Sequence, residues 1–236
     1  PANMIIECAG PAGTPVSFVA TATDNYDTNL VAGCTPTPGW TFPLGATTVT
    51  CGAIDTSGNS NYCTFTVTVR DTLAPVVTCP PAVMVECAGM AGTPVSFSAS
   101  ASDLCVGSLA ASCTPLSGSP FPLGPTIVHC RAGDSSGNSN TCSFTVTVTG
   151  TPPLIATQPS NRTNETGTTA EFTVAATGTA PLLYQWYWNG TNALAAGTNP
   201  TLTLSNLTPL MAGDYSVVVA NCAGMITSGV ATLTVV

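Results

Sequence analysis

The chain has 236 residues, a net charge of -8, and charged side chains at only 6% of its positions. Arg70, Arg131 and Arg162 are its only lysine or arginine residues, so it lacks the basic cluster that nucleic-acid binding needs. It contains no run of 18 apolar residues, so we expect no insertion of this segment into a membrane. Ten of the 11 cysteines lie in the first 142 residues without a C-x-x-C pair, which predicts disulfides in a secreted or cell-surface protein.

The first 149 residues contain one sequence written twice. A constant shift of 79 aligns residues 1–70 with residues 80–149, and 41 of the 70 aligned positions are identical. Both copies alternate apolar and polar residues between glycine, proline, aspartate and asparagine, which is the period of half-buried strands. In the first copy this pattern predicts strands over residues 47–54 and 63–69, joined by a hairpin turn at "DTSGN".

The first copy is expected to lack its opening strand. By the same shift, the counterpart of "TLAPVVTC" (residues 72–79) lies before Pro1. Two explanations stay open: the fragment was trimmed there, or a neighbouring molecule completes the sheet by adding a strand. Repeated head to tail, the second arrangement would build a homopolymer.

The repeated motifs resemble the hyalin repeat, or HYR, family. They are "CPPAVMVEC", "CTPLSGSPFPLG", a Val-x-Cys strand, and "D-x-SGN" followed by "C-x-FTVTV". The resemblance implies an immunoglobulin-like β-sandwich of the kind found in extracellular and adhesion proteins, and it brings no catalytic residues.

After "GTPPLIATQPS" the composition changes, and a third domain is predicted. Trp186 in "YQWYWNG" and Tyr215 in "AGDYSV" fit the core tryptophan and the tyrosine corner of an immunoglobulin domain, and the segment resembles those of bacterial type. No disulfide joins its sheets, so Phe172 or Val174 and Val217 are expected to face inward instead. The chain is therefore predicted to be all-β, with three tandem immunoglobulin-like sandwiches over residues 1–70, 71–150 and 151–236.

The six cysteines of the second copy allow 15 disulfide connectivities. In the implied topology the opening strand runs parallel to the last one, and two neighbouring strands carry a further cysteine each. The expected bonds within this copy are Cys79–Cys142, Cys113–Cys130 and, from what remains, Cys87–Cys105. The first copy then predicts Cys34–Cys51, and no partner can be assigned to Cys63.

Two further cysteines are left without a mate in their own domains. Tyr26 replaces Cys105 in the first copy, which leaves Cys8 unpaired, and Cys222 is alone in the third domain. We hypothesise an intermolecular Cys8–Cys222 bridge that locks a head-to-tail polymer. The alternative is a pair of buried, inert thiols.

No set of side chains suited to catalysis is visible, so the chain is predicted not to be an enzyme. Its one histidine, His129, is expected to be an exposed strand residue. The first functional hypothesis is a disulfide-stapled stalk, filament or adhesin whose partners are itself or other surface proteins.

The second hypothesis is a ligand-binding accessory module of a larger secreted protein. Asp24, Asp27 and Asp55 lie in adjacent turns where carboxylate oxygens could collect a calcium ion, the only cofactor considered. Trp40 and Trp188 are candidates for stacking on a sugar ring. Capping of turns and rim packing are the simpler roles for these residues.

Overall fold

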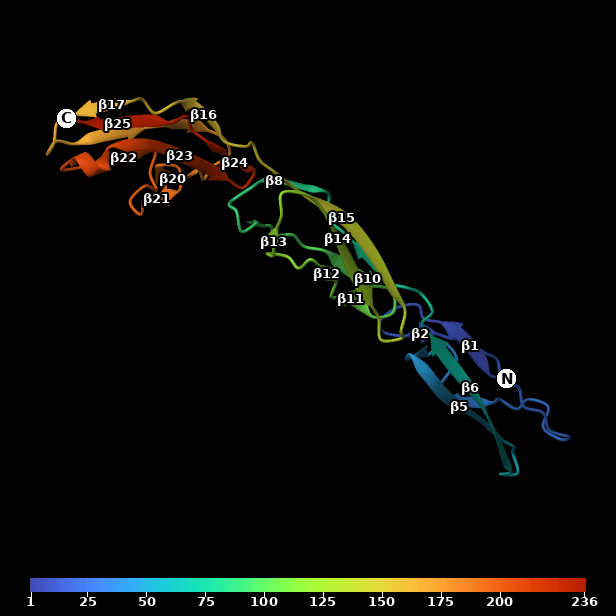
Figure 1. The fold of residues 1–236 in the computed structure, drawn as a ribbon. Helices are drawn as coiled ribbons and strands as arrows, with labels where there is room; N and C mark the ends of the chain where they lie inside the picture. The colour runs from blue at the N-terminus through green and yellow to red at the C-terminus, as the bar shows by residue number, and fades with distance from the viewer. The chain divides into compact units, whose positions relative to one another are not determined.

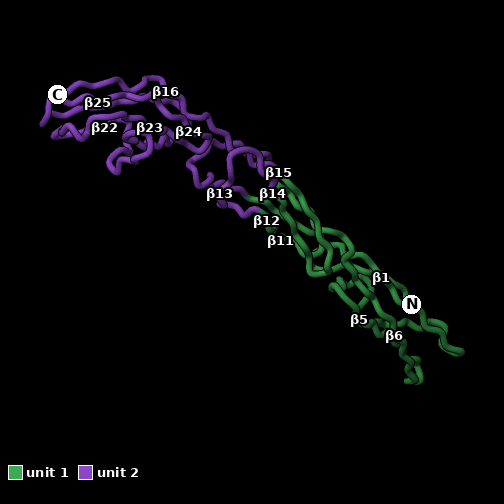
Figure 2. The backbone as a smooth tube through the Cα atoms, in the orientation of Figure 1, with its two compact units in different colours: residues 1–79, 98–114, 129–143 green, residues 80–97, 115–128, 144–236 purple.

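A computed structural model describes all residues 1–236, and apart from one 3-10 helix its regular elements are strands. The chain forms two compact units, coloured separately in Figure 2. Unit 1 comprises residues 1–79, 98–114 and 129–143, and unit 2 comprises residues 80–97, 115–128 and 144–236. The all-β, immunoglobulin-like architecture expected from the sequence is confirmed.

The first repeat, residues 1–70, forms a four-stranded sheet in the order β1-β6-β5-β3 and a small sheet of β2 and β4 (Figure 1). Its strands are β1 (Met4–Glu7), β2 (Thr14–Pro15), β3 (Gly33–Thr35), β4 (Thr41–Phe42), β5 (Gly45–Ile54) and β6 (Ser60–Arg70). β1 pairs parallel with β6, and the other neighbours are antiparallel. The end of β1 therefore lies beside the end of β6.

The predicted hairpin joins β5 to β6. Asp55 begins the turn, and its carboxylate accepts hydrogen bonds from the backbone N–H groups of Ser57 and Asn59 at 2.9 and 2.7 Å. Gly58 has a φ of +89°, a conformation that favours glycine. The repeated "SGN" sequence thus supplies the glycine and the asparagine that the turn requires.

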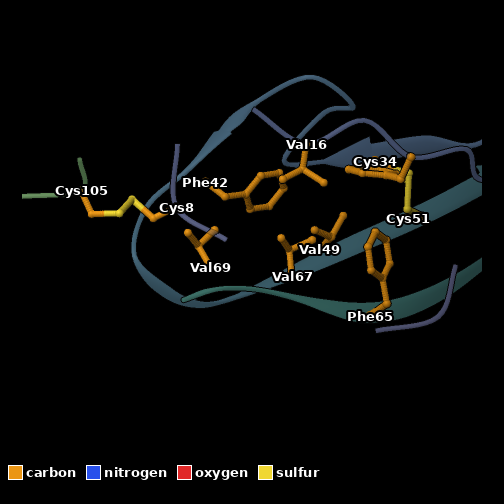
Figure 3. Close-up of a cluster of buried hydrophobic side chains, with 11 residues drawn as sticks. Cys8, Val16, Cys34, Phe42, Val49, Cys51, Phe65, Val67, Val69 and Cys105 are labelled. Carbon is orange, nitrogen blue, oxygen red and sulfur yellow. A yellow bond between two sulfur atoms is a disulfide. The ribbon is translucent and has the colours of Figure 1, made fainter. Parts of the chain in front are cut away.

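Alternation along the strands builds the core of the first repeat (Figure 3). Phe42, Val49 and Val67 are fully buried, and Phe18 packs edge-on against Phe65 with ring centroids 5.0 Å apart. The interleaved threonines point outward, which is the pattern of a sheet with one buried face.

The second repeat has the same main sheet, in the order β12-β14-β15-β8, and β8 is again parallel to β15. It also has a sheet of β11, β10 and β7 and a pair of β13 with β9. Its strands are β7 (Val76–Thr78), β8 (Val83–Glu86), β9 (Thr93–Pro94), β10 (Ser100–Asp103), β11 (Gly107–Leu109), β12 (Ser112–Thr114), β13 (Pro120–Phe121), β14 (Gly124–Gly133) and β15 (Ser139–Thr149).

The third domain contains a larger sheet in the order β17-β25-β23-β20-β21, with β24 on β23, and two pairs, β16 with β19 and β18 with β22. Its elements are β16 (Leu154–Thr157), β17 (Arg162–Asn164), β18 (Ala170–Thr173), β19 (Ala175–Thr177), β20 (Leu183–Trp188), β21 (Asn192–Ala193), β22 (Thr201–Leu204), the 3-10 helix η1 (Pro209–Met211), β23 (Gly213–Asn221), β24 (Gly224–Thr227) and β25 (Ala231–Val235).

The core of the third domain has the predicted immunoglobulin features. Trp186 on β20 is fully buried, and its indole N–H donates to the carbonyl of Asn199 at 2.9 Å. The Tyr215 hydroxyl donates to the carbonyl of Met211 at 2.7 Å, which is the tyrosine corner. Phe172 and Val217 are buried where a disulfide would otherwise join the sheets, so packing replaces the bridge.

Candidate functional site

Five disulfides stabilise the chain, and they fall into two classes. Three close within a repeat and match the expected pairs: Cys34–Cys51, Cys79–Cys142 and Cys113–Cys130. The other two, Cys8–Cys105 and Cys87–Cys222, each join a repeat to the domain that follows it in the sequence. We call the surroundings of these two bonds the first joint and the second joint.

The first joint lies where β1 ends beside β6. The parallel pairing continues one step past the strands, because the N–H of Cys8 donates to the carbonyl of Arg70 at 2.8 Å. Cys8 thereby lies at the exit of the first repeat, where it bonds Cys105 with the two Cα atoms 5.8 Å apart (Figure 3). Both cysteines are buried.

Asp71 connects the first joint to the "DSSGN" turn of the second repeat. Its carboxylate accepts a hydrogen bond from the Ser136 hydroxyl at 3.2 Å, and its carbonyl accepts one from the Asn138 side chain at 3.1 Å. The carboxylate of Asp103, also buried, accepts from the N–H of Cys105 at 2.7 Å. The turn therefore holds the exit of the first repeat at Asp71. The disulfide holds the same exit at Cys8, which is hydrogen-bonded to Arg70.

The second joint repeats the arrangement at the exit of the second repeat. The N–H of Cys87 donates to the carbonyl of Thr149 at 2.8 Å, and Cys87 bonds Cys222, which follows β23. Gly150 lies against this bond: a Cβ at that position would be 2.7 Å from the sulfur of Cys87 and 3.4 Å from that of Cys222. The Asn221 side chain donates to the carbonyl of Thr151 at 2.8 Å.

Two cysteine predictions are wrong. Cys87 does not bond Cys105, and Cys8 and Cys222 do not bond each other between molecules, because each has a partner in the same chain. The physical reason is the parallel pairing of β1 with β6 and of β8 with β15. This pairing carries Cys8 and Cys87 to the exits of their repeats, where the next domain supplies the second sulfur. Cys63 is the one free cysteine, and it is exposed.

The three candidate calcium ligands are engaged with the chain itself. Asp24 accepts from the N–H groups of Tyr26 and Asp27, and Asp27 accepts from the N–H of Thr56 at 2.8 Å. Asp55 accepts from Ser57 and Asn59 as part of the hairpin turn. Their ligand oxygens do not form a group within 4.8 Å of one another. Calcium binding by these residues stays a prediction.

Two other groups of metal-ligating side chains have their ligand atoms within 4.8 Å of one another. One comprises Cys79, Cys130 and Cys142, and the other comprises Asp71, Asp103 and Cys105. All four cysteines are in disulfides, so their sulfur atoms are not available as thiolate ligands. Only the two carboxylates of the second group keep ligand capacity.

The hydrogen bonds of the hairpin turn predict a measurable titration. The Asn59 side chain, the Asn59 N–H and the N–H groups of Ser57 and Gly58 hold the pKa of Asp55 below its ordinary value. Because the folded-state pKa is depressed, this contribution to stability is present above the unfolded-state pKa and is lost as pH falls through the folded one. We expect the carboxyl carbon of Asp55 to titrate by NMR below its ordinary value, and the Asn59→Ala variant to titrate higher. An Asp55 midpoint that Asn59→Ala leaves unchanged would contradict this account.

The remaining sequence candidates occupy ordinary positions. His129 on β14 is exposed, as expected. Trp40 packs edge-on against Phe42 with ring centroids 4.9 Å apart, and Trp188 is half-buried with its indole N–H unpaired. No helix of the chain combines the length and the apolar character needed to cross a bilayer.

Comparison with known families agrees with this architecture. The HYR domain model matches residues 8–69 and 70–148, which together are more than half of the chain.

The chain belongs to the HYR domain family.

An immunoglobulin domain model matches residues 152–221, after the two HYR domains. The bacterial type of this third domain stays a prediction.

Among curated relatives, hyalin of Strongylocentrotus purpuratus is 40% identical over 144 residues, covering 57% of this chain and 12% of that protein. Hyalin of Lytechinus variegatus is 40% identical over 143 residues, covering 57% of this chain and 27% of that protein. A sushi, von Willebrand factor type A, EGF and pentraxin domain-containing protein of Mus musculus is 33% identical over 150 residues, covering 61% of this chain and 4% of that protein. The chain thus spans about a quarter or less of these relatives.

Solved immunoglobulin structures are also similar. Immunoglobulin domains 1–5 of Sidekick-1 match with 16% identity and a TM-score of 0.47, covering all of this chain and 57% of that one. The immunoglobulin complex of titin M10 and obscurin-like 1 matches with 27% identity and a TM-score of 0.34, covering 37% of this chain and 96% of that one. The HYR and immunoglobulin domains with five disulfides identify an extracellular or cell-surface module of the adhesion type, and the domain types point to a non-catalytic one.

Proposed function

We propose that the chain is a load-bearing structural segment of an extracellular or cell-surface protein. The observation that carries the proposal is that equivalent cysteines, Cys8 and Cys87, both bond a cysteine of the following domain. A disulfide inside one sandwich stabilises that sandwich alone. A disulfide to the next domain also gives a pulling force a covalent route that bypasses most of the residues of the chain.

The two joints shorten the covalent route between the chain ends. The shortest path from Pro1 to Val236 runs through residues 1–8, 105–87 and 222–236, which are 42 of the 236 residues. At about 3.4 Å per extended residue, this path measures about 150 Å, whereas the reduced chain would extend to about 800 Å. Force on the ends would therefore be borne by the disulfides after only a short extension.

Single-molecule stretching between Pro1 and Val236 tests the proposal. We expect the oxidised chain to reach its limit at about 150 Å and the chain pulled in reductant to reach about 800 Å. In the Cys222→Ser variant the route runs through residues 1–8, 105–113 and 130–236, so its limit should be about 420 Å. An oxidised chain that extends as far as the reduced one would exclude this function.

A further inference from the structure

The two joints cover their disulfides to different extents. At the first joint both cysteines are buried: Cys8 is 4% exposed and Cys105 is 9% exposed. At the second joint Cys87 is 4% exposed, whereas Cys222 is half-buried. A thiol can exchange with a disulfide only if it reaches the sulfur that it attacks. Of these four cysteines, Cys222 is therefore the one that solvent reaches most readily.

A cavity of about 280 Å³ lies beside the second joint. Cys87 and Cys222 both line it, together with apolar side chains that include Met90, Leu123 and Val148. Every lining residue belongs to unit 2. A single water molecule needs only about 15 Å³ of such space, so the cavity has room for a small organic molecule beside the disulfide.

The joints also differ in charge. At the first joint the sulfur of Cys105 and the carboxylate oxygens of Asp71 and Asp103 lie within 4.8 Å of one another, and both carboxylates are buried. The species that attacks a disulfide is a thiolate, so these negative charges oppose its approach. No Asp, Glu, Lys or Arg lines the cavity of the second joint. An acidic side chain in the lining therefore does not repel a thiolate there.

We propose that Cys222 is a reversible S-thiolation site for a low-molecular-weight thiol. The thiolate of the small molecule attacks the sulfur of Cys222, and a disulfide forms between the two. The Cys87–Cys222 bond breaks, and Cys87 leaves as a thiolate that takes up a proton from solvent. The exchange has no net oxidation. Attack of the Cys87 thiolate on the sulfur of Cys222 reverses it and expels the small thiol.

Thiolation of Cys222 opens the second joint and leaves the first one closed. The peptide chain is then the one covalent link between the second repeat and the third domain. The Cys79–Cys142 bond closes inside the second repeat, so its exchange would open neither joint. This inference goes beyond the load-bearing function, because it holds whether or not the joints carry force.

The test uses the whole folded chain with Cys63 alkylated, and 2-mercaptoethanol as the thiol. N-ethylmaleimide stops the exchange at early times, and trypsin then cleaves the unfolded, unreduced chain after its three arginines. Release of fragment 163–236 measures opening of the second joint, and release of fragment 1–70 measures opening of the first. Cys222 is the only cysteine of fragment 163–236, so the mass of that fragment shows what Cys222 carries.

We expect fragment 163–236 to appear at a rate about tenfold or more above that of fragment 1–70, since access and charge both favour exchange at the second joint. Each released copy should carry one 2-mercaptoethanol on Cys222. Equal rates for the two fragments would overturn the proposal, because both joints would then open by unfolding. A fragment 163–236 that carries N-ethylmaleimide instead would also overturn it, because the attack would have fallen on Cys87.

A pair of glycine variants tests the route through the cavity. Gly89 lines the cavity, and a Cβ there would meet no atom within 4 Å, so Gly89→Gln adds an uncharged side chain without a clash at its Cβ. Gly10 is its counterpart under the shift of 79 and has equally open surroundings, so Gly10→Gln is the matched control.

Gly89→Gln should slow the release of fragment 163–236 about threefold or more, because the added side chain restricts access to the sulfur. It should leave the release of fragment 1–70 unchanged. Gly10→Gln should leave the release of fragment 163–236 unchanged. A Gly89→Gln chain that exchanges as fast as the unaltered one, or equal slowing by the two variants, would overturn the proposal.

Discussion

Trypsin digestion of the unfolded but unreduced chain, with Cys63 blocked, is expected to release no free fragment. Cleavage after Arg70, Arg131 and Arg162 gives the fragments 1–70, 71–131, 132–162 and 163–236. The Cys8–Cys105, Cys79–Cys142 and Cys87–Cys222 bonds tie the other three fragments to 71–131. Mass spectrometry should therefore find one species that contains all four, and reductant should separate them.

Single variants of the same digestion test each joint. With Cys105→Ser only fragment 1–70 should come free, and with Cys222→Ser only fragment 163–236 should. Release of fragment 163–236 from the unaltered chain would favour the Cys87–Cys105 pairing expected from the sequence and would remove the second joint.

Replacing Trp186 with alanine is expected to lower the free energy of unfolding of the third domain by about 3–5 kcal/mol. Trp186 is fully buried at the centre of that core, packs near Phe172 with ring centroids 6.2 Å apart, and donates its indole N–H to Asn199. The variant loses the buried ring, leaves a cavity and deprives a carbonyl of its donor. Native-state hydrogen exchange at the amides of β23 measures the change.

The matched controls are Trp186→Phe and Trp188→Phe. Both remove an indole N–H, but that of Trp188 has no partner, so we expect the smaller loss at position 188. A loss below about 1 kcal/mol for Trp186→Ala, or an equal loss for the two phenylalanine variants, would refute this account of the core.

The sequence predicts local features of this protein well. The hairpin at Asp55 follows from Gly58 and Asn59, and the roles of Trp186 and Tyr215 follow from their spacing. These features depend on residues near in sequence or on a well-defined sandwich position. Two of the three disulfides within the repeats are also of this kind, because they join cysteines that lie opposite each other on paired strands.

The joints were not predicted, because Cys87 was assigned a partner inside its own domain and Cys8 and Cys222 were assigned to a bond between molecules. The strand that runs parallel to the last one is β1 or β8 and not the expected opening strand, because β7 pairs antiparallel with β10. The information needed was partly present: a strand parallel to the last strand of its repeat brings the cysteine after it to the exit of that repeat. Extending the parallel pairing of β1 with β6 by one residue places Cys8 beside Arg70, and the same step places Cys87 beside Thr149. The absence of a cysteine at Tyr26 and the solitary Cys222 then both have an explanation.

The loss of strand structure at residues 21–24 could not be predicted from those residues alone. Residues 21–24 have nearly the sequence of β10, so any pattern that predicts one strand predicts the other. Whether the segment becomes a strand depends on its partner, since a strand edge gains its hydrogen bonds only from a neighbour.

Gly150 and Asp71 are equivalent positions under the shift of 79, and the two joints make opposite demands on them. At the first joint a carboxylate is needed to reach Ser136 on the following HYR domain. At the second, any side chain would collide with the sulfur of Cys87 where an immunoglobulin domain follows. In this chain the residue after the last strand of an HYR repeat therefore differs with the domain that follows: it is aspartate before the second HYR domain and glycine before the immunoglobulin domain.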